Sequence, residues 1–194
     1  MEKIEIRKLT LDDDLNQVGR LIYYTDDYVF PYVYDTPDDG AKVHAEMVVR
    51  DTLYNYENIT IGVINGEIAG IVVMKEAPLK ISKDEMISAF DAAGVAHDER
   101  FERVFKEYWG LLEKEPAGYY IANVCVDQRY RHRGVARAML NTILEKGKVY
   151  NLESVVANEN AFKLYQSLGF VVEYRYPGFT DIPCYRMQRK VDCM

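Results

Sequence analysis

The segment Val124-Cys-Val-Asp-Gln-Arg-Tyr-Arg-His-Arg-Gly-Val-Ala136 decides the architecture of this 194-residue chain. Val124 and Val126 have the β-branched side chains of a buried strand, and the polar residues after them end that strand near Asp127. A basic turn follows, and the residues beyond Gly134 have the apolar spacing of a helix. The segment therefore predicts a strand, a short basic turn and a helix in direct succession.

The basic turn has the chemistry of an anion site. Arg131 and Arg133 flank Gly134 and offer forked guanidinium donors. The first N–H groups of the next helix favour phosphate, and the small residues Gly134 and Ala136 let a ligand approach the backbone. Taken alone, these residues are equally well explained as a solvated basic rim that includes Arg137. The chain contains neither the P-loop pattern G-x-x-x-x-G-K-[ST] nor the dinucleotide pattern G-x-G-x-x-G.

Composition limits the class of protein. A chain of 194 residues with 48% hydrophobic residues is expected to form one domain over 1–194. Its net charge of −7 argues against nucleic acid as a partner. The three cysteines, at 125, 184 and 193, have no C-x-x-C spacing, so we expect neither a disulfide framework nor a metal site. No run approaches the ~18 apolar residues of a membrane span, and a cytoplasmic protein without a membrane partner is expected.

Hydrophobic periodicity predicts the remaining elements. Strands are expected over residues 3–9, 59–64, 67–75, 119–126, 152–157, 170–176 and 184–188. Helices are expected from a cap at Thr10 or Asp12 to Tyr24, over 41–54, 83–93 and 99–112, from the basic turn to Gly147, and from a cap at Asn158 or Asn160 to Gly169. Asn65-Gly66 predicts a tight hairpin. The strands on either side of the helix after the basic turn are expected to be parallel.

Two motifs occur in a fixed order. Tyr130-Arg-His-Arg-Gly-Val-Ala136 follows the apolar strand, and Asn158-Glu-Asn-Ala-Phe-Lys-Leu-Tyr-Gln-Ser-Leu-Gly-Phe170 follows later. The first resembles the acyl-CoA motif R/Q-x-x-G-x-G/A of the GNAT superfamily of acyl-CoA-dependent N-acetyltransferases, and the second resembles its N-x-x-A-x-x-L-Y-x-x-x-G-F motif. The resemblance is close over residues 119–170. His132 stands where many members have glycine, and the predicted helical insertion at about 77–117 exceeds the connection common in the family.

The resemblance implies an α/β (α+β) fold with a mixed, mostly antiparallel sheet, a central parallel strand pair and flanking helices. It also implies acetyl-CoA as co-substrate, with its pantetheine arm between the parallel strands and its pyrophosphate on residues 131–137. The implied cofactor-binding residues are Val124, Cys125, Val126, Arg131, His132, Arg133, Gly134, Val135, Ala136, Arg137 and Asn158. Asn158 has an equally good alternative role as a helix cap.

The resemblance further implies two catalytic residues. Tyr165 is the candidate general acid, because a phenol within reach of the sulfur can protonate the leaving thiolate. By spacing alone Tyr165 belongs to the apolar stripe of its helix. Glu153 is the candidate general base for the amine, and a solvated or ion-paired glutamate is an equal alternative. Tyr119, Tyr120 or a water chain stay open as the base, and the oxyanion is expected on a backbone N–H near Val126.

The implied reaction is acetyl transfer from acetyl-CoA to a primary amine of a small molecule or a peptide, by direct attack. The alternative is an acyl-CoA-binding module without turnover. The segment Tyr23 to Asp39, in which six tyrosine and phenylalanine residues alternate with five aspartates, is predicted to wall the amine site, although a solvated loop explains it too. The oligomeric state stays open, a homodimer included.

Overall fold

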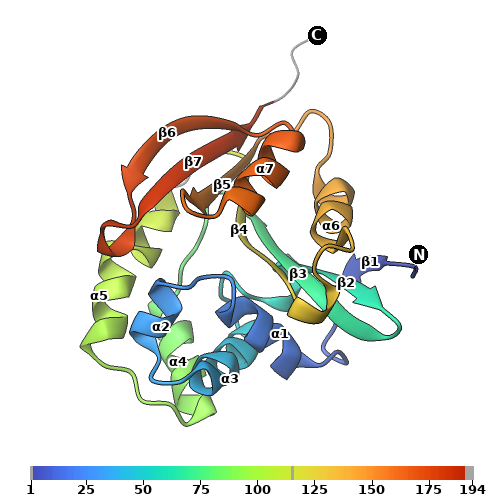
Figure 1. Ribbon diagram of the computed structural model, residues 1–194. Coiled ribbons are helices and arrows are strands. Elements are labelled where there is room, and N and C mark those ends of the chain that lie inside the picture. The colour runs from blue at the N-terminus through green and yellow to red at the C-terminus, as the bar shows by residue number, and fades with distance from the viewer. Residues whose placement is uncertain (1, 115, 191–194) are drawn as a thin grey trace.

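The computed structural model describes residues 2–114 and 116–190 and contains one mixed sheet in the order β1-β2-β3-β4-β5-β7-β6 (Figure 1). Its strands are β1 Glu5–Lys8, β2 Ile59–Ile64, β3 Glu67–Glu76, β4 Tyr119–Val126, β5 Tyr150–Val155, β6 Val171–Pro177 and β7 Pro183–Arg189. Among the strands of the described residues, only the pair β4 and β5 is parallel, and the other pairs are antiparallel. The predicted fold class, with a parallel pair at the centre of a mostly antiparallel sheet, is confirmed.

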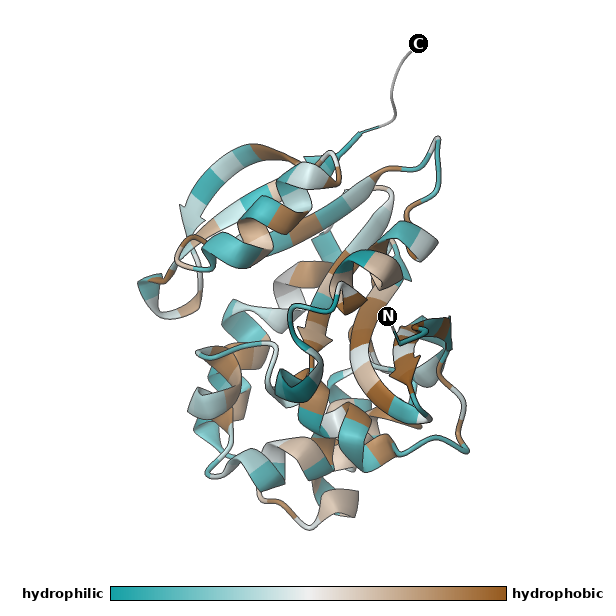
Figure 2. Ribbon diagram, turned by 45° about the vertical axis from the view of Figure 1, so that its right-hand side comes forward, coloured by the Kyte–Doolittle hydropathy of each residue, from teal (hydrophilic) through white to brown (hydrophobic). Residues whose placement is uncertain are grey.

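Helices cover both faces of the sheet. They are α1 Leu15–Tyr23, α2 Val29–Val33, α3 Pro37–Val48, α4 Lys83–Ala93, α5 Glu99–Glu107, α6 Val135–Ile143 and α7 Glu159–Ser167, with short 3-10 turns at Tyr56–Asn58, Trp109–Lys114, Gln128–Tyr130 and Phe179–Asp181. One core joins the sheet to α1–α5, and a second joins it to α6 and α7. Figure 2 shows the hydrophobic residues gathered on the central strands and on the helix faces turned toward them.

Several predicted boundaries were wrong, each for a local reason. The cap of α1 is Asp14, which accepts a hydrogen bond from the N–H of Gln17, and not Thr10 or Asp12 as predicted; the hydroxyl of Thr10 instead donates to Asp13. Helix α3 begins at Pro37 rather than at residue 41, since Thr36 accepts a hydrogen bond from the N–H of Asp39. It ends at Val48 rather than at residue 54.

Two more helices end earlier than their sequence pattern predicts. Helix α5 stops at Glu107, and residues 109–114 continue as a 3-10 turn instead of extending the helix to residue 112. Helix α6 ends at Ile143, four residues before Gly147. The hairpin at Asn65-Gly66 is confirmed, with φ of 52° and 82° at its two central residues.

Strands β4 and β5 pair over only three residues. The parallel register joins Tyr119 to Tyr150, Tyr120 to Asn151 and Ile121 to Leu152, and then the strands part. Strand β4 meanwhile stays paired with β3 as far as Val126. The second half of β4 therefore has one edge without a strand partner among the described residues, which is the arrangement expected for binding an extended ligand arm.

Close packing of α1 against α3 fixes the chain that follows α1. A Cβ atom on Gly19 would lie 2.2 Å from the carbonyl oxygen of Ala41, so only glycine permits this approach of the two helices. The contact anchors the end of α1 beside the parting strands. The segment after α1 is thereby held opposite β5 and α7.

Candidate active site

A cleft of about 1170 Å³ opens where β4 and β5 part. Its walls come from the segment after α1, the bend after α5, the second half of β4, the basic turn, β5, the start of α7 and the β6–β7 loop. In Figure 1, α7 and β5–β7 form the upper side of this region and α1–α5 the lower side. Every residue predicted for cofactor binding or catalysis lines the cleft, except Arg133.

The basic turn presents a row of backbone donors to the cleft. His132 and Gly134 both have left-handed backbone conformations, with φ of 61° and 82°. Among the described residues, no acceptor bonds the N–H groups of residues 132–137. Alternation into the left-handed region turns successive N–H groups toward one concavity, which binds anions. His132 thus adopts a left-handed conformation that costs little for glycine and that few other residues adopt.

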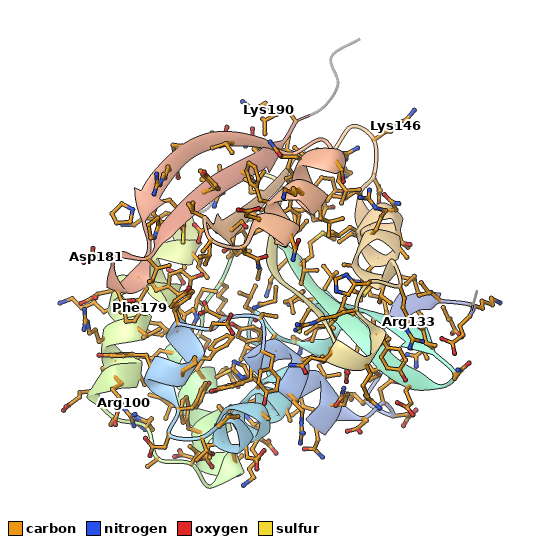
Figure 3. All side chains as sticks on the ribbon, viewed as in Figure 1. Arg100, Arg133, Lys146, Phe179, Asp181 and Lys190 are labelled. Carbon is orange, nitrogen blue, oxygen red and sulfur yellow. The ribbon has the colours of Figure 1, made fainter. Side chains whose placement is uncertain are left out.

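The arginines of the turn divide into two kinds. The side chains of Arg131 and Arg137 line the cleft and bond only neutral oxygens, the Val126 carbonyl at 3.3 Å and the Ser167 hydroxyl at 2.9 Å. Arg133 instead lies outside the cleft lining, with Nη1 2.5 Å from Oε2 of Glu2, and its place near the N-terminus is visible in Figure 3. The guanidinium groups of Arg131 and Arg137 are therefore the ones placed to meet a bound anion.

Tyr165 reaches the cleft from α7. Its ring is 8% exposed and packs edge-on against Phe170. Tyr165 therefore belongs to the buried face of α7, as the spacing predicted. Burial raises the pKa of its hydroxyl to about 12. The phenol is therefore protonated at neutral pH, as a proton donor must be.

Glu153 lies on β5 within a network of charged and aromatic groups. Its Oε1 is 3.7 Å from Nη1 of Arg186, whose side chain is 3% exposed and stacks on the ring of Tyr120. Burial, the charge of Glu153 and a hydrogen bond to Glu153 together raise the pKa of Tyr176. The ion-paired alternative for Glu153 is thus observed, and the same carboxylate also lines the cleft.

The remaining predicted residues lie at the rim of the cleft, along β4 or outside the cleft. Asn158 accepts a hydrogen bond from the N–H of Ala161 and so caps α7, at the rim of the cleft. Tyr120 lines the cleft and is buried, whereas Tyr119 stacks on Tyr150 at 5.4 Å and is absent from the lining. Val124 packs toward the α6–α7 core, and Cys125 toward the α1–α5 core.

The first part of the aromatic and acidic segment forms the opposite wall of the cleft. Residues 24–30 line it, and the later part up to Asp39 does not. Asp26 accepts hydrogen bonds from the N–H groups of Tyr28 and Val29, both at 2.7 Å, and burial raises its pKa. Burial, with the charge of Asp26 among the smaller causes, raises the pKa of Tyr54, Tyr108 and Cys184, which line the same cleft.

An aromatic and cationic contact bounds the cleft at the β6–β7 loop. The rings of Tyr32 and Phe179 meet at 5.2 Å, and the guanidinium of Arg103 lies over both of them. These residues come from α2, the β6–β7 loop and α5, and Figure 3 shows Phe179 at the tip of that loop. Tyr32, Arg103 and Phe179 thus join the two sides of the molecule.

Sequence reasoning missed several polar residues that line the cleft. Asn123 interrupts an otherwise apolar strand, and this was the only signal that it has a special role. Tyr54, Tyr108 and Tyr176 come from segments assigned to helix, insertion and closing strand, where nothing in the sequence marks them. Only the tertiary structure brings them together.

A family comparison agrees with this geometry. The model of the Acetyltransferase (GNAT) family matches residues 23–170, which include β4, the basic turn, β5 and α7. The chain belongs to the GNAT acetyltransferase family. Proteins of this family are acyltransferases that bind acetyl-CoA and an acceptor. No curated protein matches the chain in sequence.

Solved structures show the same fold. The chain resembles an N-acetyltransferase from Staphylococcus aureus Mu50, with a TM-score of 0.70, 16% identity, and 95% and 99% of the two chains covered. It resembles a protein described as histone acetyltransferase HPA2 and related acetyltransferase from Corynebacterium glutamicum, with a TM-score of 0.69, 20% identity, and 100% and 99% covered. The ribosomal-protein-S18-alanine N-acetyltransferase of Escherichia coli has a TM-score of 0.54, 15% identity, and 99% and 96% covered.

Within residues 2–114 and 116–190, no group of three or more His, Cys, Asp and Glu side chains is placed to hold a metal ion. In the same part of the chain, no helix combines the length and the apolar character that crossing a membrane requires.

Proposed function

We propose that this GNAT protein transfers an acetyl group from acetyl-CoA to the primary amine of a small molecule or peptide, by direct attack of the amine. The observation that carries the proposal is that one cleft joins three features: free N–H donors in the basic turn, the protonated phenol of Tyr165, and the carboxylate of Glu153. A binding module without turnover requires only the first of these.

The cleft residues fit acetyl-CoA. The N–H groups of residues 132–137, with Arg131 and Arg137, would hold the pyrophosphate, and a Cβ atom added at Gly134 meets no atom within 4 Å, so this concavity is open. The unpaired edge of Val124–Val126 would bond the pantetheine arm, with Asn158 beside it. When bound, acetyl-CoA supplies a thioester as the acyl donor.

Two of the chain's own residues would then transfer protons. Glu153 takes a proton from the bound ammonium group and so frees the lone pair that forms the C–N bond. Tyr165 gives its hydroxyl proton to the sulfur as the C–S bond breaks, and the nitrogen loses its second proton to solvent as the amide forms. The backbone N–H of Val126 stabilises the charge on the carbonyl oxygen. Solvent returns a proton to Tyr165 and removes one from Glu153, so the net result is an amide and a thiol.

The two described cysteines favour direct attack over an acetyl-cysteine intermediate. Burial raises the pKa of Cys125 to about 12 and that of Cys184 to about 11. A thiol attacks a thioester only as its thiolate, and neither group forms much thiolate at neutral pH. The amine itself is therefore the nucleophile that the cleft supports.

A turnover assay tests the proposal. The protein is incubated with acetyl-CoA and n-propylamine, spermidine or a short peptide with a free N-terminus, and both free thiol and N-acetylated product are measured. Acetylated product that appears in proportion to released thiol supports the transferase. Calorimetric binding of CoA without product from any amine would instead establish the binding module.

The wall formed by residues 24–30 is proposed to attract a cationic amine. Changing Asp26→Asn and Asp27→Asn together should raise the amine KM by about 5-fold and change the acetyl-CoA KM by less than about 2-fold, because the loss is electrostatic and confined to one wall. Both hydrogen bonds to Asp26 go to Oδ1, which asparagine retains, so the fold should persist. Asp38→Asn, on the part of the segment outside the cleft, is the control, and an unchanged amine KM in the double variant would remove this wall from the amine site.

A further inference from the structure

A bulge in β4 turns Asn123 toward the α1 side of the cleft. Val73 of β3 lies opposite Asn123, and Met74 lies opposite Ile121, so Ala122 has no partner in the register. An extra residue of this kind bends a strand and redirects its side chains. Asn123 is thereby placed just beyond the last residue of β4 that pairs with β5, at the point where the cleft begins.

The hydrogen bonds around Asn123 fix which way its amide points. Its Nδ2 donates to the hydroxyl oxygen of Thr25 at 2.6 Å, and the same hydroxyl donates to the carbonyl of Ile22 at 2.6 Å. A hydroxyl has one proton, and Thr25 has given it to Ile22, so Thr25 can only accept from Asn123. If the amide were flipped, Oδ1 of Asn123 and the hydroxyl oxygen of Thr25, both acceptors, would lie opposite each other.

This orientation leaves Oδ1 of Asn123 as a buried acceptor. The residue is 9% exposed, and among the described residues no group donates to Oδ1. Buried polar atoms in proteins nearly always have a partner, and a carbonyl oxygen can bind only a donor. The residue lines the cleft, so a ligand of the cleft is a natural source of that donor.

Neighbouring groups indicate what kind of donor it is. Leu152 of β5 packs into the α6–α7 core, so the next residue, Glu153, faces the same side of the sheet as Asn123. Asp26 lies on the wall just beyond Thr25. A nitrogen with several N–H bonds and a positive charge matches two carboxylates and a neutral carbonyl better than a hydroxyl does.

We propose that Oδ1 of Asn123 accepts a hydrogen bond from the attacking nitrogen of the amine and thereby orients it. The inference rests on the proposed function and names a residue for it. Glu153 removes one proton from the nitrogen while Asn123 holds another N–H, and these two contacts leave the lone pair free to form the C–N bond. Thr25 serves this role indirectly, because it holds the amide in its orientation.

Three variants test the proposal on whichever amine of the turnover panel the wild type acetylates fastest. Asn123→Leu removes the acceptor and keeps the branched shape, whereas Asn123→Asp keeps an oxygen at the same place. Thr25→Val keeps the acceptor and removes the hydrogen bond between residues 25 and 123. Asn123→Leu should lower kcat/KM for the amine by about 10- to 100-fold, the usual effect of losing a hydrogen bond to a charged group. Asn123→Asp and Thr25→Val should lower it by no more than about 5-fold, because in the aspartate variant the Thr25 hydroxyl can turn and donate to the carboxylate.

The acetyl-CoA KM and the thermal melting temperature provide the controls. All three variants should keep the acetyl-CoA KM within about 2-fold of wild type, because the change is confined to the amine side. Equal losses of kcat/KM in Asn123→Leu and Thr25→Val would overturn the proposal. Both variants remove the hydrogen bond between β4 and the segment after α1, and only Asn123→Leu removes the acceptor. Wild-type kcat/KM in Asn123→Leu would overturn it as well, while a wild type that acetylates none of the amines would defeat the proposed function itself.

Discussion

Tyr165→Phe should lower kcat by about 100-fold or more and leave CoA affinity nearly unchanged. The change removes one hydroxyl and keeps the ring against Phe170, so the packing of α7 is preserved. A thiolate that must leave without a proton donor leaves slowly, which places the loss in the chemical step. Steady-state kinetics and CoA calorimetry on the same preparation measure the two quantities.

The pH dependence of the wild type bears on the same assignment. Because burial raises the pKa of Tyr165 to about 12, the hydroxyl stays protonated across the range in which the protein is assayed. Activity should therefore not decline through loss of this proton below about pH 10. Tyr119→Phe is the matched control, since Tyr119 lies outside the cleft, and it should retain wild-type kcat. A Tyr165→Phe variant with the kcat of wild type would exclude the phenol as the acid.

Replacing both Arg131 and Arg137 with alanine should weaken CoA binding by about 100-fold or more, because each charge-assisted hydrogen bond contributes roughly 1.5–3 kcal/mol. Both side chains line the cleft and bond only neutral oxygens, so both are available to a phosphate. Pantetheine, which has no phosphate, should bind the double variant within about 2-fold of wild type. Calorimetry with CoA and pantetheine gives both values.

Arg133→Ala is the control for that experiment. Its guanidinium is ion-paired with Glu2 outside the cleft, and the variant keeps the backbone N–H through which residue 133 is proposed to bind. CoA affinity should change by less than about 3-fold. Equal losses for CoA and pantetheine in the double variant would show that the arginines do not face the pyrophosphate.

The sequence by itself determined the central architecture. Alternation of apolar residues and a βαβ arrangement around the basic turn predicted the parallel pair of β4 and β5, because helical and strand periods differ and local turn chemistry is short-range. The two motifs, one at residues 130–136 and the other at 158–170, predicted the family. Every cofactor-binding or catalytic residue that the motifs implied lines the cleft except Arg133, whose partner Glu2 is 131 residues away.

Helix ends were less predictable, since competition between neighbouring side chains decides them. Thr10 has the right chemistry to cap α1, but its hydroxyl donates to Asp13 and the cap is Asp14. In the same way the bend at Tyr108 ends a helix whose apolar pattern continues. Periodicity reports which face is buried, and it says little about where a helix stops.

Only the tertiary structure decided how the amine side of the cleft is built. Asn123 becomes a buried acceptor because a bulge rotates it and Thr25, 98 residues earlier, takes its amide N–H. Glu153 meets Arg186 because β5 and β7 pair in one register. The residues that would recognise the amine come from segments distant in sequence, and the free energy that brings them together is that of packing the whole core rather than any local preference of the chain.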